Sequence, residues 1–268
     1  GIGIGAWATV GCGATVVKDV PPGVTVVGTP ATPLGLTLGL IEHFQHQGYA
    51  VIRHLVAPYP IEQALAALNT QDLTGRAIHY AGDGQVNSIH VLHHDLFFQD
   101  LAANPALMRI AGALLGEPVR MRGVELFAKP AHGGMPSPWH QDNAYWCARP
   151  AQGLTMWIAL DACSEANGGL TYIPGSHHGG LFPHQPSWAA GSSQEICGPL
   201  PSGRETPHLD PGDVATHHCL TIHGSAPNLS AHPRRGVTIQ YVGESVTYDT
   251  AAVAHYEREL ARQMEARS

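Results

Sequence analysis

The chain has 268 residues, of which 44% are hydrophobic, and a formal net charge of -7 at pH 7. A chain of this size can bury a full core and is typical of one main domain. Its 14 lysines and arginines are too few for a broad electrostatic grip on nucleic acid or an anionic membrane. We therefore expect a small-molecule partner.

Cysteine usage and apolar runs indicate the compartment. The five cysteines form no Cys-x-x-Cys pair and no even framework, which favours a reduced chain. No apolar run approaches the roughly 18 residues of a membrane span, and no basic region precedes a signal-like core. We expect a cytoplasmic protein.

Residues 1–33 differ in character from the rest of the chain. Residues 4–9 and 10–15 form a six-residue repeat in which each unit begins with an aliphatic residue followed by Gly. Such a short period indicates a parallel β-helix. With residues 16–23 and 27–31, the segment resembles the last coils of a left-handed β-helix acyltransferase of the hexapeptide-repeat family.

Two such coils cannot form a domain alone, because solenoids need at least about three stacked repeats. We interpret residues 1–33 as the remnant of a larger fusion that has lost an upstream acyltransferase domain, and residues 34–268 as the main domain. The alternative is a Gly- and Val-rich edge segment. No histidine precedes His43, so acyl transfer by this chain is not expected.

Helical patterns dominate the first part of the main domain. Apolar residues at helical spacing predict a helix over Leu38–Gln47 that ends at Gly48, and another over Ile61–Leu68. A strand is predicted between them, over residues 49–56. Asn104 and Pro105 are typical of a helix start, and we expect that helix to run to Leu115 and end at Gly116.

Strands dominate afterwards. Short segments rich in β-branched and aromatic residues are separated by Gly, Pro and Asn, and predict strands over Val119–Lys129, Leu154–Leu160, Leu170–Ile173, Val214–Leu220 and Val237–Val242. A charged amphipathic helix is predicted over Tyr248–Arg267. We therefore predict an α+β, mainly β, fold with a jelly-roll or double-stranded β-helix core and flanking helices.

A His-x-Asp pattern occurs three times in this chain of 18 histidines. Asp95, in the first copy, stands at a helix start and is interpreted as an N-cap. The copy that begins at His208 runs into a Pro-Gly turn. Only the copy at His140 and Asp142 lies in an aromatic stretch, residues 139–146, that is expected to lead into a strand.

Strand geometry gives this third copy a chemical meaning. Residues two apart in a strand point to the same face, so His140 and Asp142 can bind one metal ion, and His223 can supply a third ligand. Two histidines and one carboxylate on one face leave positions open for a cosubstrate and O2, as in non-haem Fe(II) oxygenases.

Five ordered blocks carry a family resemblance: residues 138–146, 157–161, 167–177, 212–213 and 223–228, the last followed by Arg234. In order and spacing, residues 40–242 resemble the phytanoyl-CoA dioxygenase family. The resemblance implies a double-stranded β-helix core, Fe(II), and 2-oxoglutarate and O2 as cosubstrates. It implies that His140, Asp142 and His223 bind the metal.

The resemblance also implies roles around the cosubstrate. Arg234 would pair with the distal carboxylate of 2-oxoglutarate, and a planar guanidinium suits that task. Arg235 is the alternative, although strand alternation lets only one of the two point inward. Ser225 and Gln141 would contact the cosubstrate and Trp157 would lie near it, or they serve in strand packing and turn capping.

The remaining candidates are less specific. Lys129 could reach an anionic substrate or end a strand, and Tyr145 and Trp146 could line the pocket mouth or the core. Glu125 and Arg149, with Lys129, hint at a polar substrate such as an amino acid or a phosphonate. The other histidines are expected away from the metal: His218 in the core or supporting the site, and His177 and His178 at the rim.

The predicted activity is hydroxylation of an unactivated C–H bond of a small molecule, with release of succinate and CO2. Related halogenases lack the carboxylate ligand, so Asp142 favours oxygen insertion, while desaturation or epoxidation by the same site stays open. Two other classes remain as alternatives: a non-catalytic cupin-like binding module, and a fragment of an acyltransferase fusion.

Overall fold

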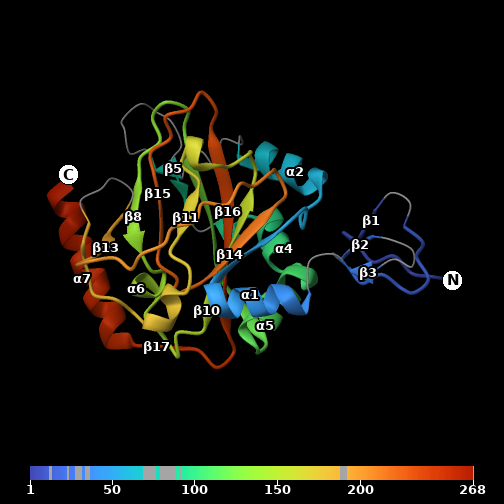
Figure 1. Cartoon of the computed structure of the whole chain (residues 1–268), viewed down its shortest axis with the longest axis horizontal. Helices are drawn as coiled ribbons and strands as arrows, with labels where there is room; N and C mark the ends of the chain where they lie inside the picture. Colours follow the sequence, from blue (N-terminus) through green and yellow to red (C-terminus); the bar gives the residue numbers. More distant parts are fainter. Residues whose placement is uncertain are drawn as a thin grey trace.

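The protein is described by a computed structural model over residues 1–11, 14–22, 24–27, 32–33, 37–68, 77–78, 88–90, 92–187 and 192–267. Its main body is a set of β-sheets with helices packed at the sides (Figure 1). The α-helices are α1 (Leu38–Gln47), α2 (Pro58–Leu68), α4 (Leu96–Ala102), α5 (Pro105–Leu115), α6 (Asn143–Trp146) and α7 (Thr250–Arg267).

Local capping chemistry sets the ends of the early helices. The side chain of Thr37 accepts a hydrogen bond from the Leu40 amide at the start of α1, and Gly48 ends that helix in the left-handed conformation, with φ 77°. Asn104 and Gly116 do the same for α5. The predicted bounds of both helices are confirmed, whereas α2 begins three residues before its prediction, at Pro58.

A seven-stranded antiparallel sheet forms the centre of the molecule. Its strands, in spatial order, are β4 (Tyr49–Ile52), β14 (Val214–His218), β10 (Gly153–Ala159), β16 (Arg234–Gly243), β7 (Val119–Lys129), β6 (Ser88–Ile89) and β5 (Ala77–Ile78). β16 and β7 are the long pair, in register from Arg234 opposite Lys129 to Gly243 opposite Val119. We call this the large sheet.

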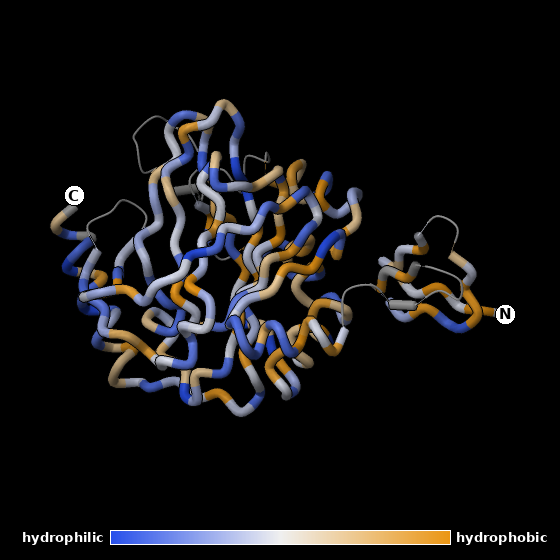
Figure 2. Tube along the Cα trace, in the orientation of Figure 1, coloured by the Kyte–Doolittle hydropathy of each residue, from blue (hydrophilic) through white to orange (hydrophobic). Residues whose placement is uncertain are grey.

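The two faces of the large sheet have different roles. On β10, Leu154, Met156 and Ile158 join the main hydrophobic core together with residues of α1, α2, α4 and α5. Figure 2 shows hydrophobic segments gathered where these helices lie against the sheet. Because side chains alternate along a strand, Thr155 and Trp157 point to the opposite face, which we call the inner face.

A smaller antiparallel sheet covers the inner face. Its order is β11 (Leu170–Tyr172), β15 (His223–Ser225) and β8 (Ser137–His140). Lys129 of the large sheet donates to the Ser225 carbonyl of the small one, and Tyr172 contacts His217 across the same gap. Two facing antiparallel sheets confirm the predicted jelly-roll core.

Short elements connect these sheets. The remaining strands are β9 (Ala148–Arg149), β12 (His184–Pro186), β13 (Gln194–Ile196) and β17 (Thr247–Tyr248), where β12 pairs with β13 and β9 with β17. The 3-10 helices are η1 (Leu92–His94), η2 (Glu165–Asn167) and η3 (Ser176–Gly179). The final helix starts at Thr250 rather than Tyr248, because Tyr248 belongs to β17.

The strand predicted over residues 49–56 ends at Ile52 instead. His54 has φ 51°, and its amide donates to Asp213 Oδ1 at 2.8 Å. The Arg53 guanidinium reaches the other oxygen of the same carboxylate at 2.7 Å. A residue 160 positions away therefore bends the chain out of the sheet, which local sequence patterns do not reveal.

The N-terminal segment forms a sheet of its own from β1 (Thr9–Val10), β2 (Thr25–Val27) and β3 (Thr32–Pro33). β1 and β2 pair in parallel, as stacked coils require, and β3 is antiparallel. Of the predicted closing coil over residues 16–23 and 27–31, residues 23 and 28–31 lie outside the described residues, as does residue 34 at the predicted boundary. The hexapeptide assignment, the division at residue 33 and the lost upstream domain remain predictions.

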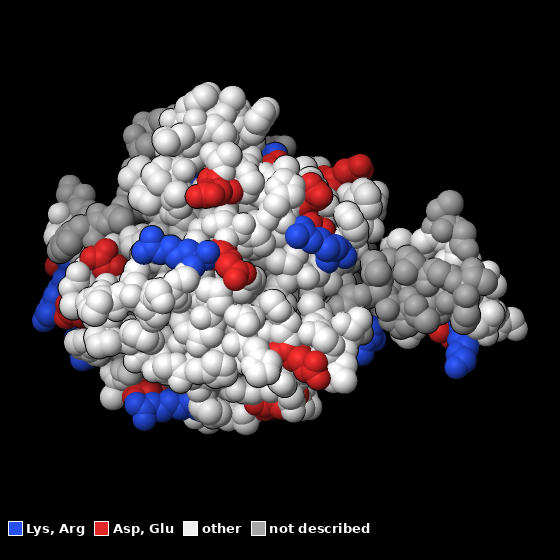
Figure 3. Space-filling view, in the orientation of Figure 1, with Lys and Arg blue, Asp and Glu red and all other residues white. Residues whose placement is uncertain are grey.

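The surface carries scattered charges. The face in Figure 3 shows separated acidic and basic side chains and no continuous basic patch. Within the described part of the chain, no helix combines the length and apolar character needed to cross a membrane. The described cysteines Cys147, Cys163, Cys197 and Cys219 are all free.

Candidate functional site

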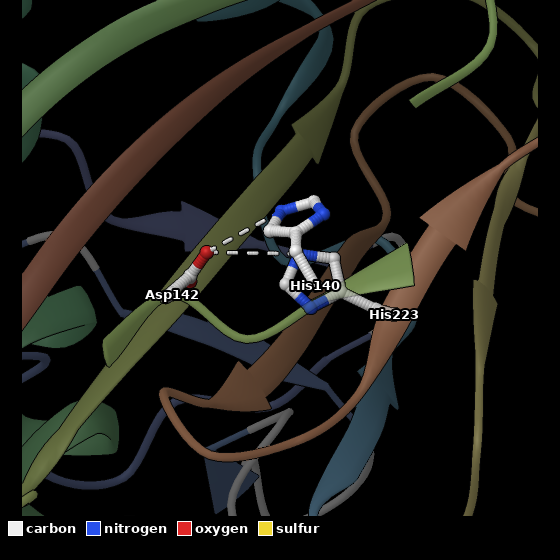
Figure 4. A group of neighbouring side chains, drawn as sticks. All are labelled: His140, Asp142 and His223. Atoms are coloured by element: carbon white, nitrogen blue, oxygen red, sulfur yellow. Dashed lines mark ion pairs between the residues drawn. The ribbon is translucent and has the colours of Figure 1, made fainter. Parts of the chain in front are cut away.

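Two neighbouring strands of the small sheet bring three ligand-type side chains together. His140 ends β8 and His223 begins β15, and the two are directly paired in register. Asp142 Oδ1 lies 3.9 Å from His140 Nε2 and 3.6 Å from His223 Nε2 (Figure 4). One ligand atom from each residue falls within 4.8 Å of the others, so the group can hold a metal ion.

Asp142 reaches the site by a different route from the predicted one. β8 ends at His140, and Asp142 has helical torsion angles, φ -57° and ψ -34°, as the first residue before α6. Residues 143–146 are helical rather than leading into a strand. The side chains of His140 and Asp142 come together because the chain turns after β8. Alternation along a strand is not the reason.

Both imidazoles are oriented by backbone carbonyls. His140 Nδ1 lies 2.7 Å from the Pro138 carbonyl oxygen, and His223 Nδ1 lies 3.0 Å from that of Thr221. A carbonyl can only accept, so each Nδ1 carries the proton and each Nε2 presents a lone pair to the site. Burial lowers the pKa of both histidines, which favours the neutral form that binds metals.

The two oxygens of Asp142 have separate tasks. Oδ2 accepts a hydrogen bond from Thr155 Oγ1 at 2.6 Å and faces His217 Nε2 at 3.2 Å, which leaves Oδ1 directed at the two histidines. Burial alone would raise the pKa of Asp142, but electrostatic attraction to the neighbouring His223 and His217 and the hydrogen bond with His217 lower it overall. The carboxylate is therefore ionised at neutral pH.

Sequence reasoning missed His217 and Thr155. His217 is buried and continues the contact chain through Nδ1, 3.3 Å from the Tyr172 hydroxyl. Its neighbour His218, predicted as a core or supporting residue, points away, accepts from the Leu220 amide and lies near His177. Strand alternation over residues 214–218, anchored on the inner face, is the signal that could have identified His217.

Arg234 begins β16 on the inner face and is buried. Its Nε and Nη2 donate to the Gly168 carbonyl at 3.2 and 3.0 Å, and its guanidinium lies 5.2 Å from the Trp157 ring centre. Arg235 points the other way and pairs with Asp161 at 2.8 Å. The structure therefore places the predicted inward arginine, Arg234, and the predicted Trp157 side by side.

Lys129 lies directly opposite Arg234 in the β7–β16 register. Its Nζ donates to the carbonyls of Ser225 and Ala226, at 3.3 and 2.5 Å. Burial, and then the charge of Arg234, lower its pKa to about 6. The structure thus groups Lys129 with the predicted cosubstrate residues rather than with a separate substrate site.

Two observations indicate what this corner can hold. Ser225 Oγ is buried without a hydrogen-bond partner. In the described part of the chain, neither Lys129 nor Arg234 forms an ion pair with a carboxylate, although both are buried. Buried cations normally pair with anions. A small dianion with hydrogen-bond acceptors, such as 2-oxoglutarate, fits this donor set.

The side chain of Gln141 makes structural contacts, which fits the second of the two roles that the sequence left open for it. Its Nε2 donates to the carbonyls of Gly180 and Leu220, at 2.8 and 2.6 Å. Its Oε1 accepts from the Phe182 amide at 2.8 Å. Both amide hydrogens are therefore used to join two loops behind the metal ligands.

The two aromatic candidates, Tyr145 and Trp146, lie in different surroundings. Tyr145 stands with its ring edge-on to His140, 5.5 Å between centres, and its hydroxyl lies 3.1 Å from the Gln194 carbonyl. Trp146 instead packs in a small core with Ala148 and Cys219. Tyr145 remains a candidate for the pocket wall, whereas Trp146 is a core residue because α6 turns it to the opposite side.

The other singled-out residues lie away from the metal group. Asp95 caps α4, as predicted, and the His208–Asp210 pair is more than half exposed. The Arg149 side chain is 74% exposed and pairs with Asp249, so it does not contribute to the site. His177 and His178 lie on η3, half-buried and exposed respectively, and His177 contacts the Gln45 carbonyl.

The sequence of this chain is similar to those of known proteins. The family described as phytanoyl-CoA dioxygenase matches residues 44–236. A probable phytanoyl-CoA dioxygenase from Caenorhabditis elegans is 28% identical over 177 residues, covering 62% of this chain and 57% of that protein. A probable alpha-ketoglutarate-dependent hypophosphite dioxygenase from Stutzerimonas stutzeri is 35% identical over 137 residues, covering 47% of this chain and 46% of that protein. This chain thus spans about half the length of these two relatives.

Solved structures show the same fold. EctD from S. alaskensis, solved with 2-oxoglutarate and 5-hydroxyectoine, superposes with a TM-score of 0.67 at 22% sequence identity. The match covers 81% of this chain and 79% of that one. At this level of identity the similarity establishes the fold.

Proposed function

This chain belongs to the phytanoyl-CoA dioxygenase family, and from that premise we propose that it is an Fe(II)- and 2-oxoglutarate-dependent dioxygenase that hydroxylates an unactivated C–H bond of a small molecule. The observation that carries the proposal is the combination of a His–Asp–His group with a buried arginine and a buried lysine, neither of which has a carboxylate partner among the described residues. A metal site alone would fit many proteins. The second feature fits an acidic cosubstrate.

His140, Asp142 and His223 would hold the iron. Two neutral imidazoles and one ionised carboxylate oxygen are the donor set of non-haem Fe(II) oxygenases. Bound iron, with 2-oxoglutarate and O2, supplies the oxidative decarboxylation that yields succinate and CO2 and places one oxygen atom on the substrate. The chain's own contribution is the fixed orientation of the ligands, through Pro138, Thr221 and Thr155.

The cosubstrate would bind through its far carboxylate to Arg234, with Lys129 and Ser225 as further donors. The guanidinium is held from behind by the Gly168 carbonyl and by the face of Trp157. It therefore keeps one orientation and loses little conformational entropy when it binds a carboxylate. Fixing that end of the five-carbon diacid directs its keto acid end toward the metal ligands.

Asp142 bears on the type of reaction. Its carboxylate would serve as a metal ligand, and Thr155 and His217 keep it in place. A halide would then find no open position where the carboxylate binds, so oxygen transfer is the proposed outcome. Hydroxylation is the simplest form of that transfer, with succinate and CO2 as coproducts.

The substrate is proposed to be small. The hypophosphite dioxygenase and EctD are named with small polar molecules, and the chain shows no continuous basic patch on the face in Figure 3. Nothing among the described contacts of the site calls for a nucleic acid or a membrane lipid.

One experiment tests the proposal. Under anaerobic conditions, Fe(II) and 2-oxoglutarate should together produce a weak visible charge-transfer band, and O2 should then release succinate even without substrate. His140→Ala should abolish both signals, while the exposed His208→Ala should leave them intact. A folded wild-type protein that binds Fe(II) but gives neither band nor succinate would favour the cupin-like binding module instead.

A further inference from the structure

The inner face extends from the metal group to a polar wall on β7. Thr155, which holds Asp142, lies opposite Gln240 on β16, and Thr238 on β16 lies opposite Glu125 on β7. Every second side chain of a strand lies on the same face, so Glu125 and Phe127 share the inner face of β7 with the buried Lys129. Adjacent strands are about 4.8 Å apart, so Glu125 lies two strand spacings, about 10 Å, from the strand that supports Asp142.

The Glu125 carboxylate is fixed but not saturated. Oε1 lies 2.8 Å from His90 Nδ1, and Oε2 accepts from Gln240 Nε2 at 3.0 Å. An ionised carboxylate offers about four lone-pair sites, so each oxygen keeps one for a further donor. The side chain is 24% exposed and the His90 side chain 40% exposed, so this carboxylate is not sealed off from a ligand.

Aromatic rings stand near this carboxylate. Phe127, next to it on the same face, is half-buried and lies edge-on to His90. Tyr256 of α7 packs against Tyr145, which in turn packs against His140. Burial raises the pKa of Tyr256, its hydrogen bond with Ser193 lowers it, and the charge of Glu125 contributes a further rise.

A carboxylate with aromatic side chains nearby is a suitable environment for an organic cation, because its charge attracts the cation and aromatic rings can add cation–π attraction. The two basic residues of the neighbouring corner, Lys129 and Arg234, serve the cosubstrate in the function proposed above. The described residues of the inner face thus present an acidic side chain at Glu125 and basic side chains at Lys129 and Arg234.

We propose that Glu125 determines substrate specificity by binding a positively charged amine of the substrate, so that the enzyme acts on a small ammonium-bearing molecule and discriminates against anionic ones. The inference deepens the proposed function and rests on it for the reaction, though not for the binding. A purely structural Glu125, serving only its contacts with His90 and Gln240, would contribute to stability without distinguishing amines from their acylated forms.

The test compares amines with their acetylated counterparts. L-amino acids and alkylamines, each beside its N-acetyl derivative, together with hypophosphite and an acyl-CoA as anions, are titrated calorimetrically into anaerobic protein loaded with Mn(II) and 2-oxoglutarate. The same compounds are assayed for stimulation of succinate release by the iron form. We expect at least one amine to bind, and N-acetylation to weaken its binding and raise its KM at least tenfold.

Variants then assign the effect to one side chain. Glu125→Gln should raise the KM of the amine at least tenfold and remove the discrimination, with the 2-oxoglutarate requirement unchanged. Glu125→Asp should keep part of the preference, and the exposed Glu244→Gln should behave as wild type. The comparison of each amine with its acetylated form in wild-type protein stands even if a Glu125 variant does not fold.

Three results separate the inference from the proposed function. Preference for the acetylated or anionic compounds, absence of any amine binding, or an unchanged amine KM in Glu125→Gln would overturn the inference while the charge-transfer band and basal succinate stand. Loss of the band and of succinate in wild-type protein would instead overturn the proposed function. Glu125-dependent amine binding by calorimetry would support the inference even then.

Discussion

At the residue scale, the metal group depends on how Asp142 is held. One of its oxygens faces the histidines, and the other is engaged by Thr155 and His217. A carboxylate without such partners can rotate or bind through both oxygens, so these contacts preserve the open positions that a cosubstrate needs. Outer partners of this kind commonly account for a 10- to 100-fold change in metal affinity, to order of magnitude.

Removing these contacts should weaken metal binding. We expect Thr155→Val and His217→Phe each to lower the affinity for Fe(II) or Mn(II) by about 10- to 100-fold. His218→Phe is the matched control, because His218 points away from the metal group and should leave the affinity within about twofold of wild type, as expected for a residue outside the ligand network. Anaerobic titration calorimetry measures all three, and the Co(II) absorption spectrum reports any change in coordination. Equal effects at His217 and His218 would contradict the assigned role.

Arg234 and Arg235 form a natural matched pair for the cosubstrate. Arg234→Ala should weaken 2-oxoglutarate binding by about 2–5 kcal/mol, since a buried carboxylate loses its charged partner. Arg235→Ala should leave that binding unchanged and cost at most about 1 kcal/mol of folding stability, because its ion pair with Asp161 is partly exposed. Titration of the visible band gives the affinity, and the reverse order of effects would exclude Arg234.

Lys129 should make cosubstrate binding depend on pH. Its pKa of about 6 in the free protein means that it is mostly neutral above that pH. A bound carboxylate favours the charged form and raises the pKa, so binding takes up a proton above pH 6. The affinity for 2-oxoglutarate should therefore fall as the pH rises from about 6 toward the pKa of Lys129 in the complex. Below pH 6, Lys129 is charged in both the free and the bound protein, so its titration no longer changes the affinity.

Proton uptake can be counted directly. The observed enthalpy of 2-oxoglutarate binding, measured at pH 7.5 in buffers of different ionisation enthalpy, should give a slope approaching one proton in wild type, as linkage requires for one titrating group. Lys129→Met should bring the slope near zero. No uptake in wild-type protein would show that Lys129 does not sense the bound anion.

The candidate residues that the structure brings together are those tied to fixed positions along the chain. His140, Asp142, His223 and Arg234 stand in ordered blocks, and the structure brings all of them to the inner side of the sheets. The role of Gln141 stayed open in the sequence because its partners, at Gly180 and Leu220, come from distant loops. Such contacts leave no periodic signal in the sequence.

At the element scale, one glycine keeps β16 and β10 compatible. A Cβ at Gly236 would fall 2.0 Å from an atom of the Trp157 ring, which lies against Arg234. Any larger residue must therefore displace the indole that supports the guanidinium. Arg234 and Gly236 are two residues apart and lie on the same face of β16. The absence of a side chain at Gly236 therefore leaves room for the Trp157 ring that packs against Arg234.

Gly236→Ala should lower the free energy of unfolding by about 1–3 kcal/mol through overpacking. It should also weaken 2-oxoglutarate binding, because Trp157 moves. Gly39→Ala, in α1, is the control: nothing lies within 4 Å of the new Cβ, so its stability should be unchanged or rise by up to about 1 kcal/mol. Chemical denaturation measures both, and a Gly236 variant as stable as wild type would contradict the predicted clash.

Element ends were predictable only where the signal is local. α1 and α5 end where their own caps indicate, at Gly48 and Gly116. β4 stops early because Asp213, far along the chain, binds the backbone of His54. Helix ends depend on neighbouring residues and strand ends on distant ones, which explains the difference.

At the scale of the whole molecule, the main core and the N-terminal sheet are separate in their packing. Val20, Val24 and Val26 form a small cluster whose one buried member from the main body is Ala106, among the residues described. The main core draws on α1, α2, α4, α5 and the large sheet. The metal group lies wholly within the main body.

Deleting residues 1–36 should therefore preserve the fold and the site. We expect the shortened chain to keep the wild-type circular dichroism spectrum and the charge-transfer band, with a loss of at most about 1 kcal/mol of stability, as expected for a few contacts at one alanine. A truncated protein that no longer folds would contradict the division predicted at residue 33.

The distribution of the site over the two sheets has a consequence for cohesion. The three metal ligands come from the small sheet and the turn after β8, whereas Thr155, His217, Lys129 and Arg234 come from the large one. A bound ion and diacid would therefore link the large and the small sheet across the interface between them, which we call the seam. Ligands that bind only the folded state stabilise it by mass action. In the empty protein this seam is the natural place for transient opening, so loading of the site should slow amide hydrogen exchange in β8, β11 and β15 more than in the central strands.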